Sequence, residues 1–597
     1  MSSRPALVFP ALQQRRLGRT LRKWAAAELA VFFVLAVVST WPLGRFVATA
    51  LPLGTESAAT VPLLNVWTVW WNADRAGHLY RGYWDAPIFA PTPGTFAFSE
   101  PMPTTVVVAP LVWLGGHRIL AYNVFLLAAL AINGWSTFHL LRGLRFRWLV
   151  CTLGGGLVEM LPLVHSELGV LQMVPLCGIV WTIHALYRFG RCPGWKRSLL
   201  LGAAFAVTYL TCAYYGLFLS LVLLAGGGWL LGKRLRRGRT WGLLLVSAGV
   251  ASLLIAPVVA AQLRIIRTHD LRRDRDWVMR LAASPKDYVV TPWPQRWEPA
   301  VLAELRPQRY FRLGPGGLKI GLAVVGLAAG LWWRRYRAWT AFCLTMLVAA
   351  FLLSLGPKLA VGGWSPYALL MDWYPGMAQA RNVYRFAVFV QLAVVLLAAL
   401  GLQAVLTSFR AEKVGRIGNP SYGSGLLTRV RARPRSVLCW TATIGVGLLA
   451  MAEVLPAPQK LFPVPRVQEQ HQWIDWLTSQ TPADSVIACI PFPQATTVAA
   501  YEETAVWMYW GTYHHRRLVN GYSGFFPASF LQTKAAMRDF PSTAALQRLQ
   551  ALDVGYCVIR RPAFPGNSAI GKRLKLLFSD DTAQVDVYCL RSGGVTP

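Results

Sequence analysis

The stretch between residues 53 and 103 holds four carboxylates, Glu56, Asp74, Asp85 and Glu100, of which Glu56, Asp85 and Glu100 are our candidates for chemistry. Glu56 follows a glycine and a threonine, Asp85 lies in YWDAP, and Glu100 lies in FSEP. A carboxylate can remove the proton of a hydroxyl as a general base, and it can also bind a divalent cation. We therefore interpret the three as candidate catalytic residues. Asp85 and Glu100 also flank a proline-rich turn, so capping that turn is their alternative role.

The same stretch is rich in aromatic side chains of the kinds that settle at a membrane–water boundary. They are Trp67, Trp70, Trp71, Tyr80, Tyr83 and Trp84. Carboxylates beside such a belt predict an active site that faces a lipid-borne substrate. An amphipathic surface loop with solvated carboxylates is the alternative.

A second polar group falls in a short turn between two apolar runs. His165 and Glu167 flank a serine, and Gln172 follows about one helical turn later. Ionisable groups this close to a bilayer are costly and are often functional. We interpret the three as substrate-binding residues, with ordinary interfacial polarity as the alternative.

Arginines suited to phosphate occur in two places. Arg381 and Arg385 stand four apart in QARNVYRF, at the entry to an apolar run, so one helical face would present both. The planar guanidinium matches the geometry of phosphate oxygens. The stretch 264–280 is richer in arginine, but aspartates alternate with its arginines, which favours a solvated helix over a phosphate clamp. Its arginines are Arg264, Arg267, Arg272, Arg273, Arg275 and Arg280.

The composition is that of a membrane protein. The chain has 597 residues, of which 55% are hydrophobic and only 14% charged. Its formal net charge is +34, but lysine and arginine fall in short clusters between apolar runs, so they indicate orientation and contact with anionic lipid rather than nucleic acid. The nine cysteines include no CxxC pair and no Cys/His cluster at zinc spacing. The carboxylates are therefore the remaining candidates to bind a metal ion, which would be a divalent cation.

Apolar runs long enough to cross a bilayer predict about eleven spans. We place them at 25–43, 119–141, 148–164, 168–188, 198–213, 215–232, 241–261, 317–333, 338–355, 386–406 and 437–454. The basic residues 1–24 put the N-terminus in the cytoplasm. The run Thr104–Gly116 is short and broken by a proline, so we expect it to lie in the interface or to re-enter. The later basic loops then all fall inside.

Three regions follow from this division. Residues 1–24 form a cytoplasmic N-terminus, residues 25–455 a transmembrane domain with long outer loops at 44–118 and 262–316, and residues 456–597 an external domain. In the last region helices at 467–479 and 543–552 alternate with strands at 485–493, 554–559 and 583–590, which predicts a small α/β domain. The 407–436 connection is rich in glycine, proline and serine and predicts a flexible cytoplasmic linker. Cys557 and Cys589 lie in two predicted strands and form a disulfide only if their Cβ atoms are neighbours.

Several segments resemble the GT-C membrane glycosyltransferases and the uncharacterised bacterial multi-spanning proteins grouped with them. They are PLLNVWTVWWN, YWDAPIFAPTPGTFAFSEP, AYNVFLLAALAINGW, HSELGVLQ, RNVYRF and LVNGYSGFFP. The resemblance implies a sugar donor on a polyprenyl-phosphate or pyrophosphate carrier at the outer face of the membrane. The family usually has an Asp early in the first loop. This chain reads GTESAATVP there, so the resemblance implies Glu56 as the base and fixes no role for Asp85, Glu100 or His165.

The sequence therefore predicts a mainly α, GT-C-like glycosyltransferase of the bacterial cytoplasmic membrane. Its partners would be membrane lipid, a polyprenyl-phosphate-linked sugar and a lipid, glycan or protein acceptor. The alternative is a non-enzymatic membrane protein, such as a lipid or glycan transporter or a cell-envelope assembly scaffold. A transporter favours internal repeats and polar residues near mid-membrane. The sequence shows no obvious repeat and few such residues, which favours the enzyme.

Overall fold

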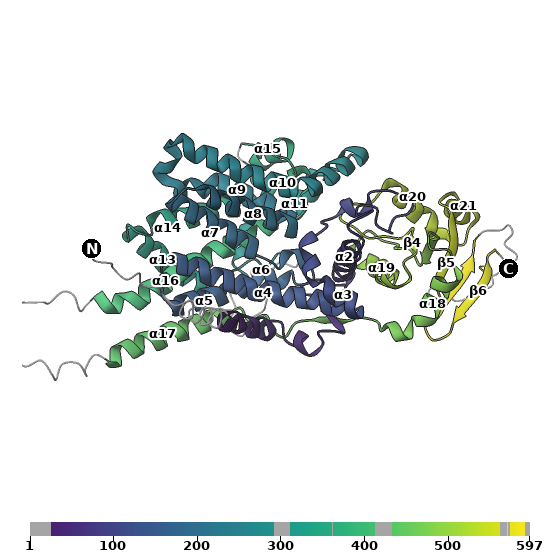
Figure 1. Cartoon of the computed structure of the whole chain (residues 1–597), viewed down its shortest axis with the longest axis horizontal. Coiled ribbons are helices and arrows are strands. Elements are labelled where there is room, and N and C mark those ends of the chain that lie inside the picture. Colours follow the sequence, from purple (N-terminus) through teal and green to yellow (C-terminus); the bar gives the residue numbers. More distant parts are fainter. Residues whose placement is uncertain are drawn as a thin grey trace, which may run out of the picture.

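The computed structural model describes residues 26–291, 311–360, 362–411, 433–561, 570 and 573–590. A bundle of long helices makes up most of the molecule, and a small sheet flanked by helices lies beyond one end of it (Figure 1). Helices α2 (Thr60–Gly77) and α3 (Ala109–Gly115) lie between the two. The predicted basic N-terminus at 1–24 and most of the predicted 407–436 linker lie outside the described residues.

At least one helix overlaps each predicted span. A first helix covers Ala26–Ser39. The others are α4 (Arg118–Gly143), α5 (Trp148–Glu159), α6 (Pro162–Ser166), α7 (Cys177–Arg191), α8 (Trp195–Thr211), α9 (Ala213–Leu231), α10 (Gly238–His269), α13 (Gly317–Trp332), α14 (Arg337–Ser354), α16 (Ala387–Ala411) and α17 (Arg433–Ala452). Within the described residues, six helical stretches are long and apolar enough to cross a membrane, and four shorter apolar helices accompany them. The count of eleven spans stays a prediction.

One predicted span begins in the wrong place. We expected a helix over 168–188, but residues 168–176 contain only the short 3-10 turn Leu171–Met173, and α7 starts at Cys177. Pro175 has no amide hydrogen to donate into a continuous helix. These non-helical residues are nevertheless buried, except for the half-buried Gln172, so the segment packs inside the protein without extending α7.

The short basic turns lie at one end of the bundle. The Arg335 guanidinium donates to the Leu144 carbonyl at 3.1 Å, which joins the α13–α14 turn to the α4–α5 turn. The Arg234 guanidinium donates to the Arg191 carbonyl, which joins the α9–α10 turn to the α7–α8 turn. Clusters far apart in the chain thus share one side, and that this side is the cytoplasmic one stays a prediction from the positive-inside bias.

We expect chemical labelling to confirm this orientation. In a Cys192→Ser background, which removes an exposed native thiol, a cysteine at Ser57 should react with a membrane-impermeant maleimide added to intact cells. A cysteine at Gly238 should react only after the cells are permeabilised. Both positions are exposed in the structure. Labelling of the Gly238 site in intact cells would reverse the orientation.

The segment predicted not to cross forms a short helix in two parts. A 3-10 helix at Pro103–Val108 continues into α3, and the left-handed Gly116 ends it. At about 2 Å and 1.5 Å per residue, the two parts reach roughly 22 Å, less than the ~30 Å hydrocarbon core. Trp113 donates to the Ala73 carbonyl of α2 at 2.8 Å, so the segment packs beside α2.

The C-terminal sheet has five strands in the order β4-β3-β5-β7-β6. They are β3 (Val486–Ile490), β4 (Arg517–Leu518), β5 (Val554–Arg560), β6 (Lys575–Asp580) and β7 (Val585–Cys589). β3 runs parallel to β4 and β5, whereas β7 is antiparallel to β5 and β6. The helices are α18 (His471–Gln480), α19 (Glu502–His514), α20 (Ala528–Ala536) and α21 (Thr543–Ala551). The sequence patterns located β3, β5, β7, α18 and α21 but not the remaining elements.

The sheet register decides the cysteine question. Cys589 lies opposite Tyr556, and Cys557 lies opposite Tyr588. Because successive side chains point to opposite faces of a strand, the two thiols face opposite sides of the sheet. They are therefore not placed to form a disulfide.

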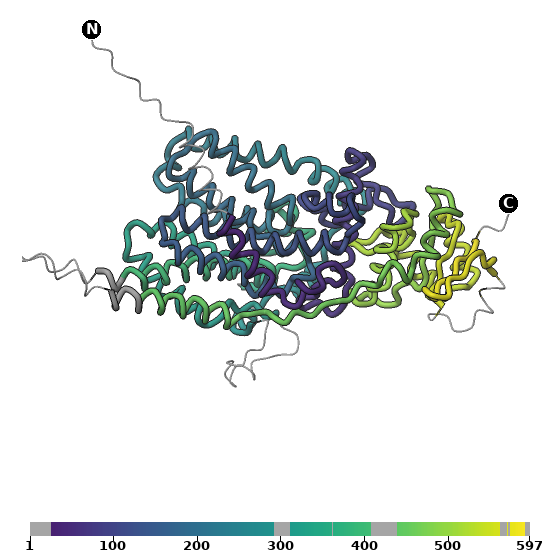
Figure 2. Tube along the Cα trace, turned by 60° about the horizontal axis from the view of Figure 1, so that its bottom comes forward, coloured from purple at the N-terminus to yellow at the C-terminus, as the bar shows by residue number. Residues whose placement is uncertain are grey.

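The loop at residues 44–118 and the C-terminal region pack against each other. Strand β1 (Ala50–Pro52) pairs with β2 (Leu461–Pro463), and the chain after α17 runs along the first loop toward the sheet (Figure 2). The Glu502 carboxylate accepts the Ala59 amide at 2.6 Å at the start of α2, where a negative charge is favourable. The interlock buries one side of α2 against α19.

This packing overturns the predicted aromatic belt in part. Trp67, Trp70 and Trp71 are only 2–4% exposed and pack against each other and Phe96 rather than lipid. The expectation was wrong because α19 and the proline-rich loop cover the face that the sequence alone leaves open. Tyr80, at 46% exposed, stays on the surface.

Candidate active site

Two glycines press the Glu56 turn against the Glu167 turn. Gly54 has a φ of +59°, and a Cβ there would lie 2.4 Å from the Ser166 carbonyl oxygen. A Cβ on Gly169 would lie 2.7 Å from the Leu53 carbonyl oxygen and 3.1 Å from Cγ of Glu56. Glycine is the residue that permits such close backbone approach. The GTE and ELG segments therefore hold two predicted carboxylates beside each other.

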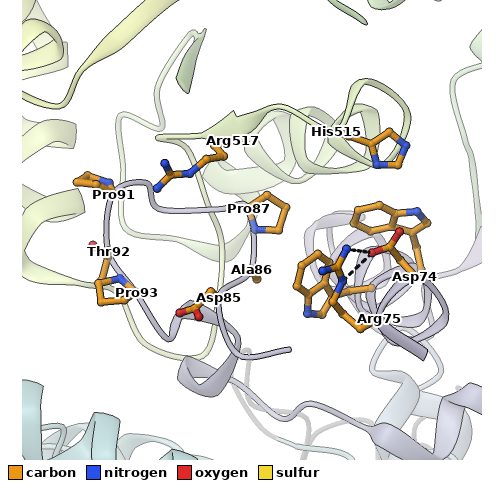
Figure 3. A pocket seen from close by; sticks show the side chains of 12 residues that line it. Asp74, Arg75, Asp85, Ala86, Pro87, Pro91, Thr92, Pro93, His515 and Arg517 are labelled. Atoms are coloured by element: carbon orange, nitrogen blue, oxygen red, sulfur yellow. Dashed lines mark hydrogen bonds and ion pairs between the residues drawn. The ribbon is translucent and has the colours of Figure 1, made fainter. Parts of the chain in front are cut away.

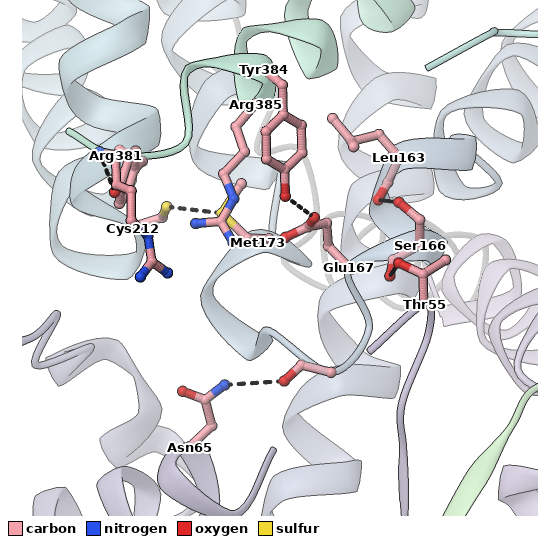
Figure 4. A network of polar contacts seen from close by, with 12 residues as sticks. Thr55, Asn65, Leu163, Ser166, Glu167, Met173, Cys212, Arg381, Tyr384 and Arg385 are labelled. Carbon is pink, nitrogen blue, oxygen red and sulfur yellow. Dashed lines mark hydrogen bonds and ion pairs between the residues drawn. The ribbon is translucent and has the colours of Figure 1, made fainter. Parts of the chain in front are cut away.

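Glu167 is held by two residues of the RNVYRF motif. Its carboxylate accepts the Tyr384 hydroxyl at 2.5 Å and the Arg385 guanidinium at 2.8 Å (Figure 4). Both ion-pair side chains are 8% exposed. Proline at the start of α6 sets the turn that ends at Glu167. A buried pair of this kind fixes geometry, because removing either partner leaves an unpaired buried charge.

Arg381 lies in the same region with its charge unpaired. Its backbone amide donates to the Tyr214 hydroxyl at 3.0 Å. Within the described part of the chain its guanidinium has no hydrogen-bond or ion-pair partner. In Figure 4 the Arg381 and Arg385 side chains extend in the same general direction from their segment.

The predicted single helical face for these arginines is wrong. Arg385 lies in the 3-10 helix Val383–Phe386, and Arg381 precedes it, separated by Asn382 at φ −98° and ψ 75°. That conformation is not helical. The two side chains nevertheless end up near each other because the extended residue leads into the turn.

The arginine-rich stretch contributes one side chain that the charge pattern did not single out. Arg273 donates to the Gly524 carbonyl, and its guanidinium lies 3.6 Å from the Phe525 ring centroid. Burial, followed by the positive charge of Arg381, lowers the pKa of Arg273 to about 10. The other arginines of this stretch are exposed, as expected for a solvated surface. Arg273 and Arg381 thus place two positive charges near each other, and we call them the Arg273–Arg381 pair.

A loop from the C-terminal region, residues 519–526, reaches into this site. We call it the covering loop. Burial raises the pKa of Tyr522 to about 12, and Arg381, Glu56 and Arg273 all lie close enough to influence that pKa. Tyr522, Tyr214, Tyr384 and Arg273 were not predicted as site residues. The segments LVNGYSGFFP and RNVYRF held the available signal for Tyr522 and Tyr384.

The surroundings of Glu56 raise its pKa above the ordinary value, which suits a general base. Burial raises its pKa from 4.5, and the charge of Glu167 raises it further. Arg385 and Arg381 oppose the shift. A carboxylate whose pKa is moved toward neutrality is a better proton acceptor when deprotonated. Glu56 is partly exposed, so an acceptor hydroxyl has access to it.

Glu100 lies at the start of α9 rather than in the open part of the site. Its carboxylate accepts the Tyr214 amide at 3.3 Å, and its second oxygen is buried without a partner among the described residues. Burial raises its pKa to about 7, against the lowering effect of Arg385. The contact makes it a helix cap next to the arginines.

Glu100 predicts a pH-dependent stability. Because its folded-state pKa is raised from 4.5 to about 7, the folded protein binds the proton more tightly than the unfolded one between these values. The group therefore destabilises the fold above pH 7, and that loss disappears as the pH falls toward 4.5. Glu100→Gln should raise the unfolding temperature in nanodiscs more at pH 8 than at pH 5. An equal change at both values would contradict the assignment, and Glu469→Gln, at an exposed position, is the control.

Three predicted residues do not join the cluster. Asp85 is exposed and accepts the Gly94 amide at 2.8 Å, so it caps the proline-rich turn. His165 is fully buried, with its Nε2 3.1 Å from the Glu159 carbonyl. The Gln172 amide oxygen is buried without a partner among the described residues.

The described residues contain no group of three or more His, Cys, Asp and Glu side chains that could hold a metal ion. The charge of Glu167 raises the pKa of Glu56, and the Glu167 carboxylate is already bound by Tyr384 and Arg385. The charged and polar side chains of this site are carboxylates, arginines and tyrosines.

Taken together, the helical bundle, the first loop with its short helices and the C-terminal region form a fold similar to that of a solved arabinofuranosyltransferase. The chain is similar to the mycobacterial arabinofuranosyltransferase AftD, with a TM-score of 0.57 and 14% identity, over 96% of this chain and 40% of AftD. It therefore spans less than half of that protein.

A second similar structure is the archaeal oligosaccharyltransferase AglB from Archaeoglobus fulgidus, solved with an inhibitory peptide and a dolichol-phosphate. The TM-score is 0.45 and the identity 13%, over 90% of this chain and 69% of AglB. No protein-family model and no curated protein matches the sequence. The likeness is therefore one of fold.

Proposed function

We propose that this protein transfers a sugar from a polyprenyl-phosphate carrier to an acceptor hydroxyl at the outer face of a bacterial cytoplasmic membrane. The observation that carries the proposal is that Glu56 lies in the same site as the Arg273–Arg381 pair. A raised-pKa carboxylate and unpaired cationic charge come together where the bundle, the first loop and the covering loop meet. The GT-C-like fold supports the same reaction class.

The chemistry divides between the two sides of the site. Glu56 takes the proton of the acceptor hydroxyl while the hydroxyl oxygen forms a bond to the anomeric carbon of the sugar. The bond between that carbon and the carrier phosphate oxygen breaks, and the electron pair leaves with the phosphate. Arg381 and Arg273 face the phosphate and stabilise its added negative charge.

Arg385 has a different task. Its charge is matched by Glu167, so it adds little net charge to the phosphate site. Tyr384 and Arg385 instead hold Glu167 in place, and Glu167 raises the pKa of Glu56. The ion pair therefore positions the base rather than binding the donor.

Reconstitution tests the proposal directly. The full chain in proteoliposomes is given synthetic polyprenyl-phosphate sugars, with arabinofuranose, mannose, glucose and galactose as the transferred groups, together with neutral oligosaccharides of the same four sugars as acceptors. Both the labelled sugar in the product and the released polyprenyl phosphate are measured. We expect equal amounts of the two with one donor. If no donor is consumed at a rate above that of empty liposomes, the protein is not such an enzyme, and the scaffold or transporter interpretation replaces it.

A further inference from the structure

A pocket of about 380 Å³ opens at the other end of α2 from Glu56. It is lined by the last turns of α2, the proline-rich loop and the segment entering β4 (Figure 3). None of the residues assigned above to base or phosphate contact lines it. Its size falls at the lower end of the range for small-ligand sites, roughly 300–1,000 Å³.

The lining combines apolar rings with polar groups on two sides. Pro87 stands in the middle, with Asp85 and Arg517 on one side and the Asp74–Arg75 pair on the other (Figure 3). Arg75 donates to Asp74 at 2.7 Å. Within the described part of the chain, the Arg517 guanidinium has no hydrogen-bond or ion-pair partner. Its donors are therefore available to a ligand.

The charges in the pocket balance. Arg75 and Arg517 contribute +2, and Asp74 and Asp85 contribute −2, so the sum is zero. Burial lowers the pKa of His515, which keeps it neutral at neutral pH. The pocket thus differs from the Arg273–Arg381 pair, which carries unbalanced positive charge. It suits an uncharged ligand that both donates and accepts hydrogen bonds.

A sugar has this character, because its hydroxyls donate and accept while its C–H faces are apolar. Buried Trp70 and Trp71 and the proline rings supply the apolar wall. We infer that this pocket binds a neutral sugar unit of the acceptor, and therefore that the acceptor is an extended oligosaccharide or polysaccharide. The inference rests on the function proposed above.

Distance requires the extended acceptor. Glu56 stands just before α2, whereas Trp70 and Asp74 lie 10 and 14 residues beyond Thr60. At 1.5 Å per residue the pocket is about 15–21 Å away along the helix. A single sugar ring cannot reach from the pocket to the base. A chain of several units can, with one end held here and the reacting end at Glu56.

Binding is measured without any donor, so that it does not depend on transfer. Neutral arabino-, manno-, gluco- and galacto-oligosaccharides of two to six units are titrated into the full chain in nanodiscs, with saturation-transfer NMR as the readout. We expect at least one series to bind, with a dissociation constant at least tenfold higher in Arg517→Ala. Arg538→Ala, an exposed arginine of the same region outside the pocket, should bind as the wild type does.

The outcomes separate the two proposals. If no series binds, or if Arg517→Ala leaves every dissociation constant unchanged, the pocket is not an acceptor site even if sugar transfer is observed. If inorganic phosphate displaces the sugar at the wild-type pocket, the ligand is an anion and the inference is wrong. If oligosaccharides bind through Arg517 but no lipid-linked donor is consumed, the proposed transfer fails and the sugar site stands.

Discussion

Glu56→Gln should reduce sugar transfer by about 10²–10⁴-fold, because that is what a positioned general base typically contributes. Glutamine keeps the size and hydrogen-bonding shape of the side chain but cannot accept the proton. The backbone contacts that hold this turn, such as the Thr55 amide to the Ser166 carbonyl at 2.9 Å, do not involve the carboxylate. Folding and membrane insertion should therefore be unaffected, as measured by yield and unfolding temperature.

The pH profile identifies the base more sharply than the rate alone. Since the pKa of Glu56 is raised above 4.5, the transfer rate should fall as the pH drops through that raised value, and the fall should vanish in Glu56→Gln. Glu469→Gln, which removes an exposed carboxylate elsewhere, should keep the wild-type rate and profile. Full activity in Glu56→Gln would show that Glu56 is not the base.

Arg381→Ala should weaken use of the donor by about 10–150-fold in kcat/KM, which corresponds to the roughly 1.5–3 kcal/mol of a hydrogen bond to a charged group. A second effect distinguishes this role from a structural one. The charge of Arg381 lowers the pKa of Glu56, so its removal should shift the acid side of the pH profile to higher pH.

The matched control is Arg272→Ala. Arg272 lies beside Arg273 but is 62% exposed and points to Asp372 at 4.0 Å, so its loss should change neither the donor KM nor the profile. If Arg381→Ala and Arg272→Ala had equal effects, the phosphate would not be bound by Arg381. The experiment uses the same proteoliposome assay and the donor that the wild type accepts.

The sequence predicted the parts of the site that lie next to strong local signals. Glu56, Glu167, Arg381 and Arg385 were all named from their positions at the ends of apolar runs, and they converge. Arg273 and Tyr522 were not named as site residues, because only tertiary packing brings the covering loop over the bundle. The alternation of charges along residues 264–280 does not distinguish Arg273, which turns inward, from its solvated neighbours.

The fold shows the same division. Apolar length located the helices, and Pro175 explains the one that starts late. The tryptophans of α2 were misplaced because a belt at the lipid boundary and a buried helix–helix contact have the same composition. What decides between them is α19, which lies more than 400 residues later in the chain and carries no signal in the local pattern.

The β1–β2 pair has a consequence for how the protein is made. Residues 50–52 leave the ribosome long before their partners at 461–463 exist, so this edge must wait while all the intervening helices are inserted. The covering loop appears later still, at 519–526. A chain synthesised only as far as α17 thus carries Glu56, Arg273 and Arg381 but lacks Tyr522 and the Gly524 carbonyl that accepts from Arg273. The order of synthesis therefore keeps the candidate site incomplete until the last part of the chain has been made.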